Sequence, residues 1–163
     1  MAANMKGSFV DAPPDKVLVI TRMLDAPRDL VYRVWTEPEH LMQWWGPKDW
    51  TTTSYSQDLR VGGQWRARIS GPDGTAFWHE GVFREIVEGK RLVFSHAWVY
   101  DDGRRSIETE VRVTFSDAGA RTKLTFEQGV FDTTLNRDNH AVGWNGCMDN
   151  LERYLSVRAG EAK

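Results

Sequence analysis

The stretch RLVFSHAWVYDDGRRSIETEVRVTFSDAGARTKLTFEQGV, residues 91–130, decides the fold because apolar and polar residues alternate along it. Successive side chains of a strand point to opposite faces of a sheet, so this alternation predicts strands. The three predicted strands are 91–100, 106–115 and 121–130. Residues that favour tight turns separate them, Asp101-Asp102-Gly103 and Asp117-Ala118-Gly119. Short turns join antiparallel neighbours, so this stretch predicts an antiparallel meander.

The alternation extends upstream, and helical periodicity appears near both ends of the chain. Further strands are predicted at residues 16–25, 51–59, 64–70 and 76–87. Two short helices are expected to start at Pro27 and Pro38, because proline fits the first turn of a helix. From about residue 133 to residue 157, apolar residues recur three or four positions apart, which predicts one long amphipathic helix. We therefore predict an α+β fold, with a seven-stranded curled antiparallel sheet around a long C-terminal helix.

Length and composition limit the classes of function. The 163 residues suit one domain, expected over residues 16–158 after a flexible arm of residues 1–15. A formal net charge of −2, without a block of five like charges, argues against a nucleic-acid partner. No apolar run is long enough to cross a membrane. The single cysteine, Cys147, excludes an internal disulfide, so we expect a cytoplasmic protein.

The hairpin turns predict which side chains share the inner face of the sheet. The turn at residues 101–104 places His96 opposite Thr109, and the following hairpin adds Gln128 to the same face. The turn at Pro72-Asp73 places Trp65 opposite Glu80.

The turn at Glu88-Gly89 leaves two registers open. One register places His79 on the inner face, opposite Trp98, and the other places Glu80 there, opposite His96. These exclude each other, because a slip of one residue reverses every side chain of a strand. We expect Glu80 to point inward, since this agrees with the Pro72-Asp73 turn.

The predicted inner face mixes bulky aromatic residues with polar groups, which is typical of a ligand pocket. Its members are Trp65, Trp78, Glu80, Phe94, His96, Trp98, Thr109 and Gln128. His140 and Trp144 of the C-terminal helix are expected to complete the pocket. We therefore predict binding of a small apolar or aromatic molecule between the sheet and this helix. A carboxylate beside an imidazole can relay a proton, so an enzyme acting through Glu80 and His96 is one alternative.

Neither a metal nor a cofactor is predicted. His79 and His96 are the only imidazoles expected near each other, and no third ligand has a suitable spacing. Gly62-Gly63 lacks the lysine and hydroxyl residue of a phosphate-binding loop. Cys147 has no base nearby in the sequence, so we expect a buried thiol that packs as a small apolar group.

Four segments of the chain resemble the AHSA-type branch of the START/birch-pollen-allergen-like (SRPBCC) superfamily. They are MLDAPRDLVYRVWTEPEHLMQWWGP (23–47), DLRVGGQWR (58–66), EGVFREIVEGKRLVFS (80–95) and GWNGCMDNLERYL (143–155). The resemblance implies a helix-grip fold with a cavity between the sheet and the last helix. Members of the superfamily carry lipids, bind hormones or cyclise polyketides.

The resemblance adds a second alternative, a co-chaperone-like protein-interaction domain. The AHSA-type branch is named after activators of the ATPase of heat-shock protein 90, which use a separate N-terminal domain to contact the chaperone. An interaction surface here would be expected around Trp44 and Trp45. A homodimer is also possible.

Overall fold

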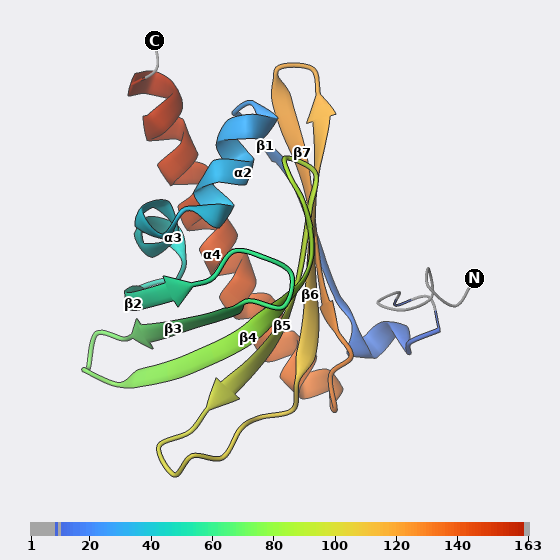
Figure 1. Cartoon of the computed structure of the whole chain (residues 1–163), viewed down its shortest axis with the longest axis vertical. Coiled ribbons are helices and arrows are strands. Elements are labelled where there is room, and N and C mark those ends of the chain that lie inside the picture. Colours follow the sequence, from blue (N-terminus) through green and yellow to red (C-terminus); the bar gives the residue numbers. More distant parts are fainter. Residues whose placement is uncertain (1–8, 10, 162–163) are drawn as a thin grey trace.

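The computed structural model describes residue 9 and residues 11–161, and it confirms the α+β fold (Figure 1). Most of the predicted arm, residues 1–8 and 10, lies outside the described residues. In chain order the elements are a 3-10 helix η1 (Pro14–Lys16), β1 (Leu18–Leu24), α2 (Arg28–Thr36), α3 (Pro38–Trp44), β2 (Thr51–Gln57), β3 (Gln64–Ser70), β4 (Ala76–Val87), β5 (Arg91–Val99), β6 (Thr109–Ala118), β7 (Arg121–Gly129) and α4 (Thr134–Glu161).

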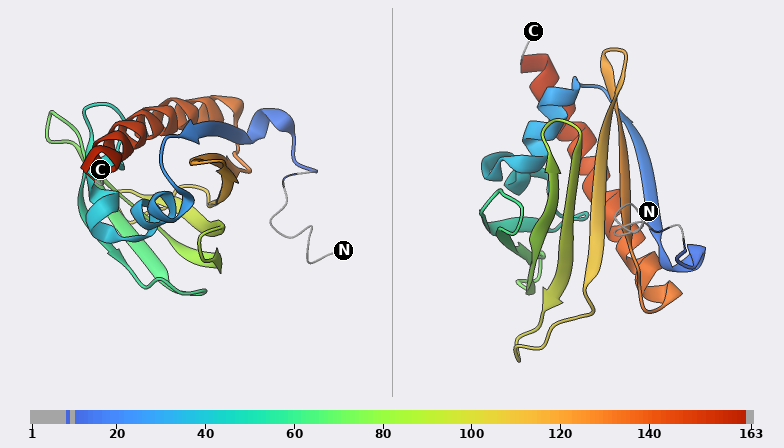
Figure 2. Two further views of the ribbon diagram at one scale, coloured as in Figure 1. Left: turned by 90° about the horizontal axis from the view of Figure 1, so that it is seen from above. Right: turned by 45° about the vertical axis from the view of Figure 1, so that its right-hand side comes forward.

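One antiparallel sheet in the described part of the chain contains seven strands, in the order β1-β7-β6-β5-β4-β3-β2. The sheet curls, and α4 lies along its concave side, as the view from above shows (Figure 2). The short helices α2 and α3 pack beside α4 at one end of this concave side. None of the helices within residues 11–161 is long and apolar enough to cross a membrane.

The predicted apolar stripe of α4 forms the centre of the core. Trp144, Met148, Leu151 and Leu155 are buried, and His140 is half-buried near the start of the helix. The indole of Trp144 packs on Phe126 of β7 with a centroid distance of 4.4 Å. These residues recur every three or four positions, so one face of α4 covers the inner face of the sheet.

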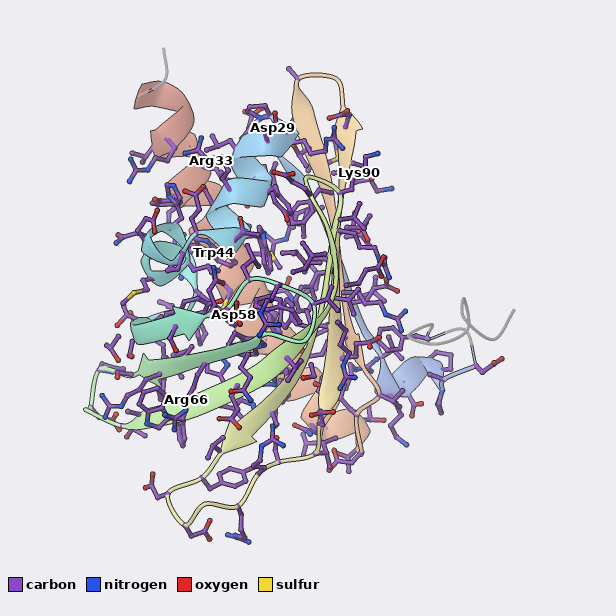
Figure 3. All side chains as sticks on the ribbon, in the orientation of Figure 1. Asp29, Arg33, Trp44, Asp58, Arg66 and Lys90 are labelled. Carbon is purple, nitrogen blue, oxygen red and sulfur yellow. The ribbon has the colours of Figure 1, made fainter. Side chains whose placement is uncertain are left out.

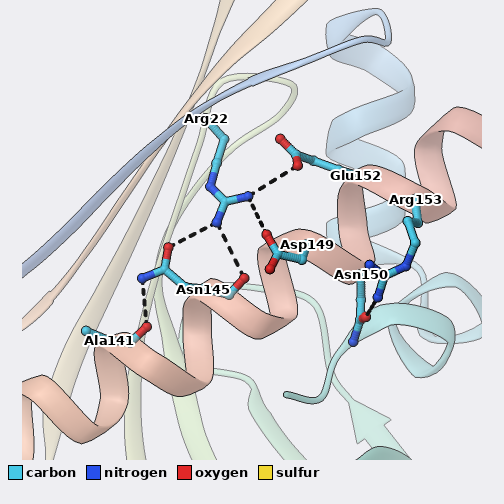
Figure 4. A network of polar contacts seen from close by, with 7 residues as sticks. All are labelled: Arg22, Ala141, Asn145, Asp149, Asn150, Glu152 and Arg153. Atoms are coloured by element: carbon cyan, nitrogen blue, oxygen red, sulfur yellow. Dashed lines mark hydrogen bonds and ion pairs between the residues drawn. The ribbon is translucent and has the colours of Figure 1, made fainter. Parts of the chain in front are cut away.

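A polar cluster fixes α4 to the edge strand β1 (Figure 4). The guanidinium of Arg22 donates hydrogen bonds to Asp149 Oδ1 at 2.9 Å, Glu152 Oε2 at 3.3 Å and Asn145 Oδ1 at 3.0 Å. The Arg22 side chain is only 19% exposed, so its charge needs these partners to offset the lost hydration. This cluster gives α4 a fixed position across the sheet.

The strand registers confirm the predicted faces of β5, β6 and β7. His96 pairs with Thr109 as predicted. Gln128 pairs with Val111 and not with Thr109, so the predicted β6–β7 register is wrong by two residues. An even slip keeps every side chain on its face, and Gln128 still donates a hydrogen bond to Thr109 Oγ1 at 2.9 Å.

The predicted orientation of β4 is wrong, because two hairpins differ from the expected register by an odd number of residues. Ser70, not Ile69, pairs with Ala76, so the β3–β4 loop has one residue fewer than expected. The β4–β5 register also shifts between Phe83 and Glu85, where a bulge adds a residue to β4. Each difference, taken alone, exchanges the inner and outer faces of β4 relative to the prediction.

His79 therefore points inward, pairs with Trp98 and is only 2% exposed. Glu80 lies on the outer face of the sheet, where Arg66 Nε and Arg105 Nε approach its carboxylate at 3.5 Å and 3.4 Å. Arg66, on β3, is labelled in Figure 3. Trp78 lies on the same outer face, and the guanidinium carbon of Arg66 is 3.9 Å from the centroid of its ring. Glu80 and Trp78 are thus removed from the predicted inner face.

Candidate functional site

A pocket of about 380 Å³ lies between the inner face of the sheet and the first half of α4. Its wall is mostly aromatic and apolar, formed by Trp45, Pro47, Trp50, Ile69, Phe77, Trp98, Tyr100 and Trp144. Its polar residues are His79, His96, Asn136, Asn139 and His140, and Gly143 and Cys147 complete it. Among the described residues, no Asp, Glu, Lys or Arg side chain lines this pocket.

Three parts of the chain bring these side chains together. Alternate residues of β4 and β5 face inward. His79 of β4 therefore shares one wall with His96 and Trp98 of β5. On α4, positions three or four apart face the sheet, which places Gly143 between His140 and Cys147. The segment between α3 and β2 supplies the tryptophans of the third wall.

Two buried histidines contact each other in the sheet wall. His79 Nδ1 and His96 Nε2 are 3.1 Å apart, within hydrogen-bond distance. Burial, followed by the neighbouring His140, lowers the pKa of His79 to about 3. Burial, followed by His79 and His140, also lowers the pKa of His96 well below its usual value. Both rings are therefore neutral near pH 7, and one donates the shared hydrogen bond to the other.

The third histidine of the pocket is held by two hydrogen bonds. His140 Nδ1 is 2.9 Å from the carbonyl oxygen of Asn136, and a carbonyl only accepts, so Nδ1 carries the proton. His140 Nε2 then accepts a hydrogen bond from the indole Nε1–H of Trp98 at 3.1 Å. Burial lowers the pKa of His140, which favours this neutral form. The ring links α4 to β5 across the pocket.

One polar atom of the sheet wall has no hydrogen-bond partner in the described part of the chain. Nε2 of His79 is buried, and no described residue forms a hydrogen bond with it. Leaving a buried polar atom unpaired costs about 1–3 kcal/mol. The ring stacks on Trp98 at a centroid distance of 4.7 Å and meets Trp45 at 4.9 Å, and both of these indoles also belong to the pocket wall. A polar group of a bound molecule is one way to satisfy this atom.

The structure places only some of the predicted site residues in the pocket wall. His96, Trp98, His140 and Trp144 lie there, and their role in binding stays a prediction.

The other predicted residues lie elsewhere. Trp65 lies behind the histidines, edge-on to His79 at 5.3 Å, and donates its indole N–H to the carbonyl oxygen of Ser95 at 3.1 Å. Phe94 packs behind Trp65 at 5.7 Å. Thr109 and Gln128 are buried and hydrogen-bonded to each other.

Sequence reasoning missed several residues of the pocket. His79 was one of two open alternatives, and the β3–β4 loop length and the bulge in β4 decide for it. Gly143 lies one helical turn from His140 and from Cys147, so the helical period could have identified it. Trp45 and Trp50 come from a segment without periodicity, and no local pattern could place them. Cys147 is buried, as expected, and burial raises the pKa of its thiol to about 12.

The described residues do not form a metal site. Within residue 9 and residues 11–161, no three His, Cys, Asp or Glu side chains are placed to hold one metal ion. Both nitrogens of His140 already form hydrogen bonds, so this ring offers no free lone pair.

The chain is similar to one family model and to several solved structures. The family model described as Activator of Hsp90 ATPase homolog 1-like protein matches residues 25–156. None of the curated proteins matches the chain. A solved protein from Nitrosomonas europaea is 26% identical, with 91% of this chain and 99% of that chain covered and a TM-score of 0.76.

A second solved structure, the AHSA1 protein from Silicibacter pomeroyi, is 20% identical, with 87% of this chain and 99% of that chain covered and a TM-score of 0.80. This likeness shows the fold alone. An uncharacterised protein from Rhizobium leguminosarum is 26% identical, with 86% of this chain and 94% of that chain covered and a TM-score of 0.70.

Proposed function

Since the chain belongs to the Activator of Hsp90 ATPase homolog 1-like protein family, we propose that it binds a small, uncharged, largely aromatic molecule in the pocket between the sheet and α4. The observation that carries this proposal is the aromatic wall around about 380 Å³ without a charged side chain among its described residues. Ligand pockets have volumes of about 300–1,000 Å³ and apolar walls with a few polar groups.

The composition of the wall favours a flat and neutral occupant. The indoles of Trp45 and Trp144 are nearly parallel, with a centroid distance of 5.9 Å and an angle of 27°, and both belong to the wall. Aromatic pairs contribute about 0.5–1.5 kcal/mol beyond the burial of their area. A charged molecule would lose its hydration without gaining an ionic partner, which is costly.

Thermal unfolding with added indole or 1-naphthol tests this proposal. A ligand at about 100 times its Kd adds about 2.7 kcal/mol to the free energy of unfolding. We expect 1-naphthol to raise the melting temperature of the wild-type protein in a saturable way. An unchanged melting temperature across such uncharged aromatic probes would contradict the proposal.

A pair of variants on α4 locates the binding. Apart from its two chain neighbours and the nearby backbone of α4, a Cβ at Gly143 meets no atom of the described residues within 4 Å, and Gly143 lines the pocket. The ring of Gly143→Phe should therefore enter the pocket and abolish the shift. Val142 is 76% exposed and lies outside the pocket wall, so Val142→Phe should leave the shift unchanged. Equal loss in both variants, or in neither, would contradict binding in this pocket.

The residues named for the two alternatives do not lie where those alternatives need them. The proton relay needs Glu80 beside His96, and Glu80 lies on the opposite face of the sheet. The interaction surface was expected around Trp44 and Trp45, which are only 2% and 6% exposed, and Trp44 Nε1 donates to the carbonyl oxygen of Val34 at 2.9 Å. A cytoplasmic location and a possible homodimer stay predictions.

A further inference from the structure

Two hydrogen bonds of His140 fix where this imidazole carries its proton. An indole N–H only donates, so the bond from Trp98 Nε1 at 3.1 Å requires a lone pair on His140 Nε2. A carbonyl only accepts, so the contact with the carbonyl oxygen of Asn136 at 2.9 Å requires a proton on His140 Nδ1. The two contacts therefore agree on one neutral tautomer, and a second proton on this ring is incompatible with the bond from Trp98.

Protonation of His140 changes the pocket wall in two ways. A proton on Nε2 turns two donors toward each other, so the link between α4 and β5 is lost and the indole N–H of Trp98 has no acceptor on this ring. It also places a positive charge in a wall that contains no carboxylate among its described residues. An uncharged aromatic occupant would remove water from this charge without offering it an ionic partner, which opposes binding.

The charged and titratable groups around His140 make it the first histidine of the pocket to gain a proton as the pH falls. Burial lowers the pKa of His140, and the nearby carboxylate of Asp132, just before α4, raises it in part. Burial, followed by the neighbouring histidines, lowers the pKa of His79 on β4 to about 3 and that of His96 on β5 well below its usual value. The remaining titratable side chains of the described wall are a phenol and a thiol, which are uncharged at acidic pH: Tyr100 and Cys147.

We propose, on the basis of the function proposed above, that His140 is a pH-sensitive positioning residue of this pocket. The neutral ring holds Trp98 in the wall and permits binding of an uncharged aromatic molecule, whereas the protonated ring weakens binding. Coupling between two binding events is reciprocal, so the bound molecule must in turn oppose protonation of His140. The pocket therefore fills near neutral pH and releases its occupant in acid.

Two measurements on the wild-type protein test both directions of this coupling. Isothermal titration of 1-naphthol should give a Kd about tenfold higher at about pH 5 than at about pH 7, the effect of one lost buried hydrogen bond. The naphthol hydroxyl, like a phenol, keeps its proton over this range, so the difference reports on the protein. NMR titration of the imidazole signals should place the midpoint of His140 at lower pH when 1-naphthol is bound.

Two variants assign the pH dependence to His140. His140→Gln places a neutral amide near the position of Nε2, and its oxygen can still accept from Trp98, so the Kd values at the two pH values should agree within about twofold. His40→Gln removes the histidine of α3, whose Nδ1 lies 2.6 Å from the hydroxyl oxygen of Tyr154 outside the described pocket wall, and should keep the tenfold difference. If His140→Gln fails to fold, the NMR midpoint of the wild-type protein still decides.

The outcomes distinguish this inference from the proposed function. Equal Kd values of the wild-type protein at the two pH values, or tighter binding at about pH 5, would overturn the inference and leave the pocket as a binding site. A midpoint of His140 that 1-naphthol does not move would also overturn it. A tenfold difference that persists in His140→Gln would overturn it by assigning the effect to another group. Failure of 1-naphthol to bind at about pH 7 would contradict the proposed function itself.

Discussion

Replacing Gly143 by alanine tests whether α4 faces open space at the pocket. Gly143 lies inside α4 (Thr134–Glu161), where glycine costs about 0.8–1.0 kcal/mol relative to alanine. Apart from its two chain neighbours and the nearby backbone of α4, the added methyl group meets no atom of the described residues within 4 Å, so no steric cost offsets this gain. Gly143→Ala should therefore raise the free energy of unfolding by about 1 kcal/mol, which corresponds to about 2–4 °C in melting temperature for a chain of this size.

Gly146 provides the matched control on the same helix. A Cβ there lies 3.2 Å from both Lys48 N and Pro47 Cα, which are backbone atoms of the segment between α3 and β2. The same gain in helix propensity is then offset by a contact that the backbone must relieve, so Gly146→Ala should give little or no stabilisation. Denaturant unfolding followed by tryptophan fluorescence measures both variants. Equal stabilisation by the two substitutions, or destabilisation by Gly143→Ala, would refute the reasoning.

Three further predictions concern the core, the histidines and the outer face. Trp144→Ala should lower the free energy of unfolding by about 3–5 kcal/mol, because the indole is buried between sheet and helix; a loss below about 1 kcal/mol in denaturant unfolding would contradict this packing. The folded-state pKa of His79 is about 3, because of burial and then His140, so the unfolded chain binds more protons between about pH 3 and 6.5. Stability should fall as the pH decreases through this range, and unfolding at about pH 7 and pH 5 should show a smaller fall for His79→Phe. Glu80→Gln should change the free energy of unfolding by less than about 1 kcal/mol and leave the affinity for 1-naphthol unchanged, since surface ion pairs contribute little; titration showing lost affinity would place this carboxylate in the pocket.

The architecture could be predicted from the sequence because its main signals are local. Alternation over residues 91–130 and helical spacing in the last segment identify the elements without knowledge of their neighbours. The β6–β7 register was wrong by two residues, yet Gln128 stayed on the predicted face, since side chains in a strand repeat every two positions.

Which side chains reach the pocket depends on loop length, a bulge and tertiary packing, and none of these has a local signal in the sequence. The β3–β4 loop length and the bulge between Phe83 and Glu85 decide whether His79 or Glu80 points inward. No glycine or proline stands at Arg84, the residue between them, so no local signal indicates the bulge. Trp45 reaches the pocket from an irregular segment, and only the packing of α3 against β2 places it there.

The resonances of the tryptophan indole N–H groups test the central claim most directly. The chain has eight tryptophans, of which Trp45, Trp50, Trp98 and Trp144 line the pocket, whereas Trp78 lies on the outer face of the sheet. Titration of 1-naphthol into ¹⁵N-labelled protein should shift the indole signals of these four residues in a saturable way and leave that of Trp78 in place. The largest shift at Trp78, or no shift at the four pocket indoles, would contradict binding between the sheet and α4.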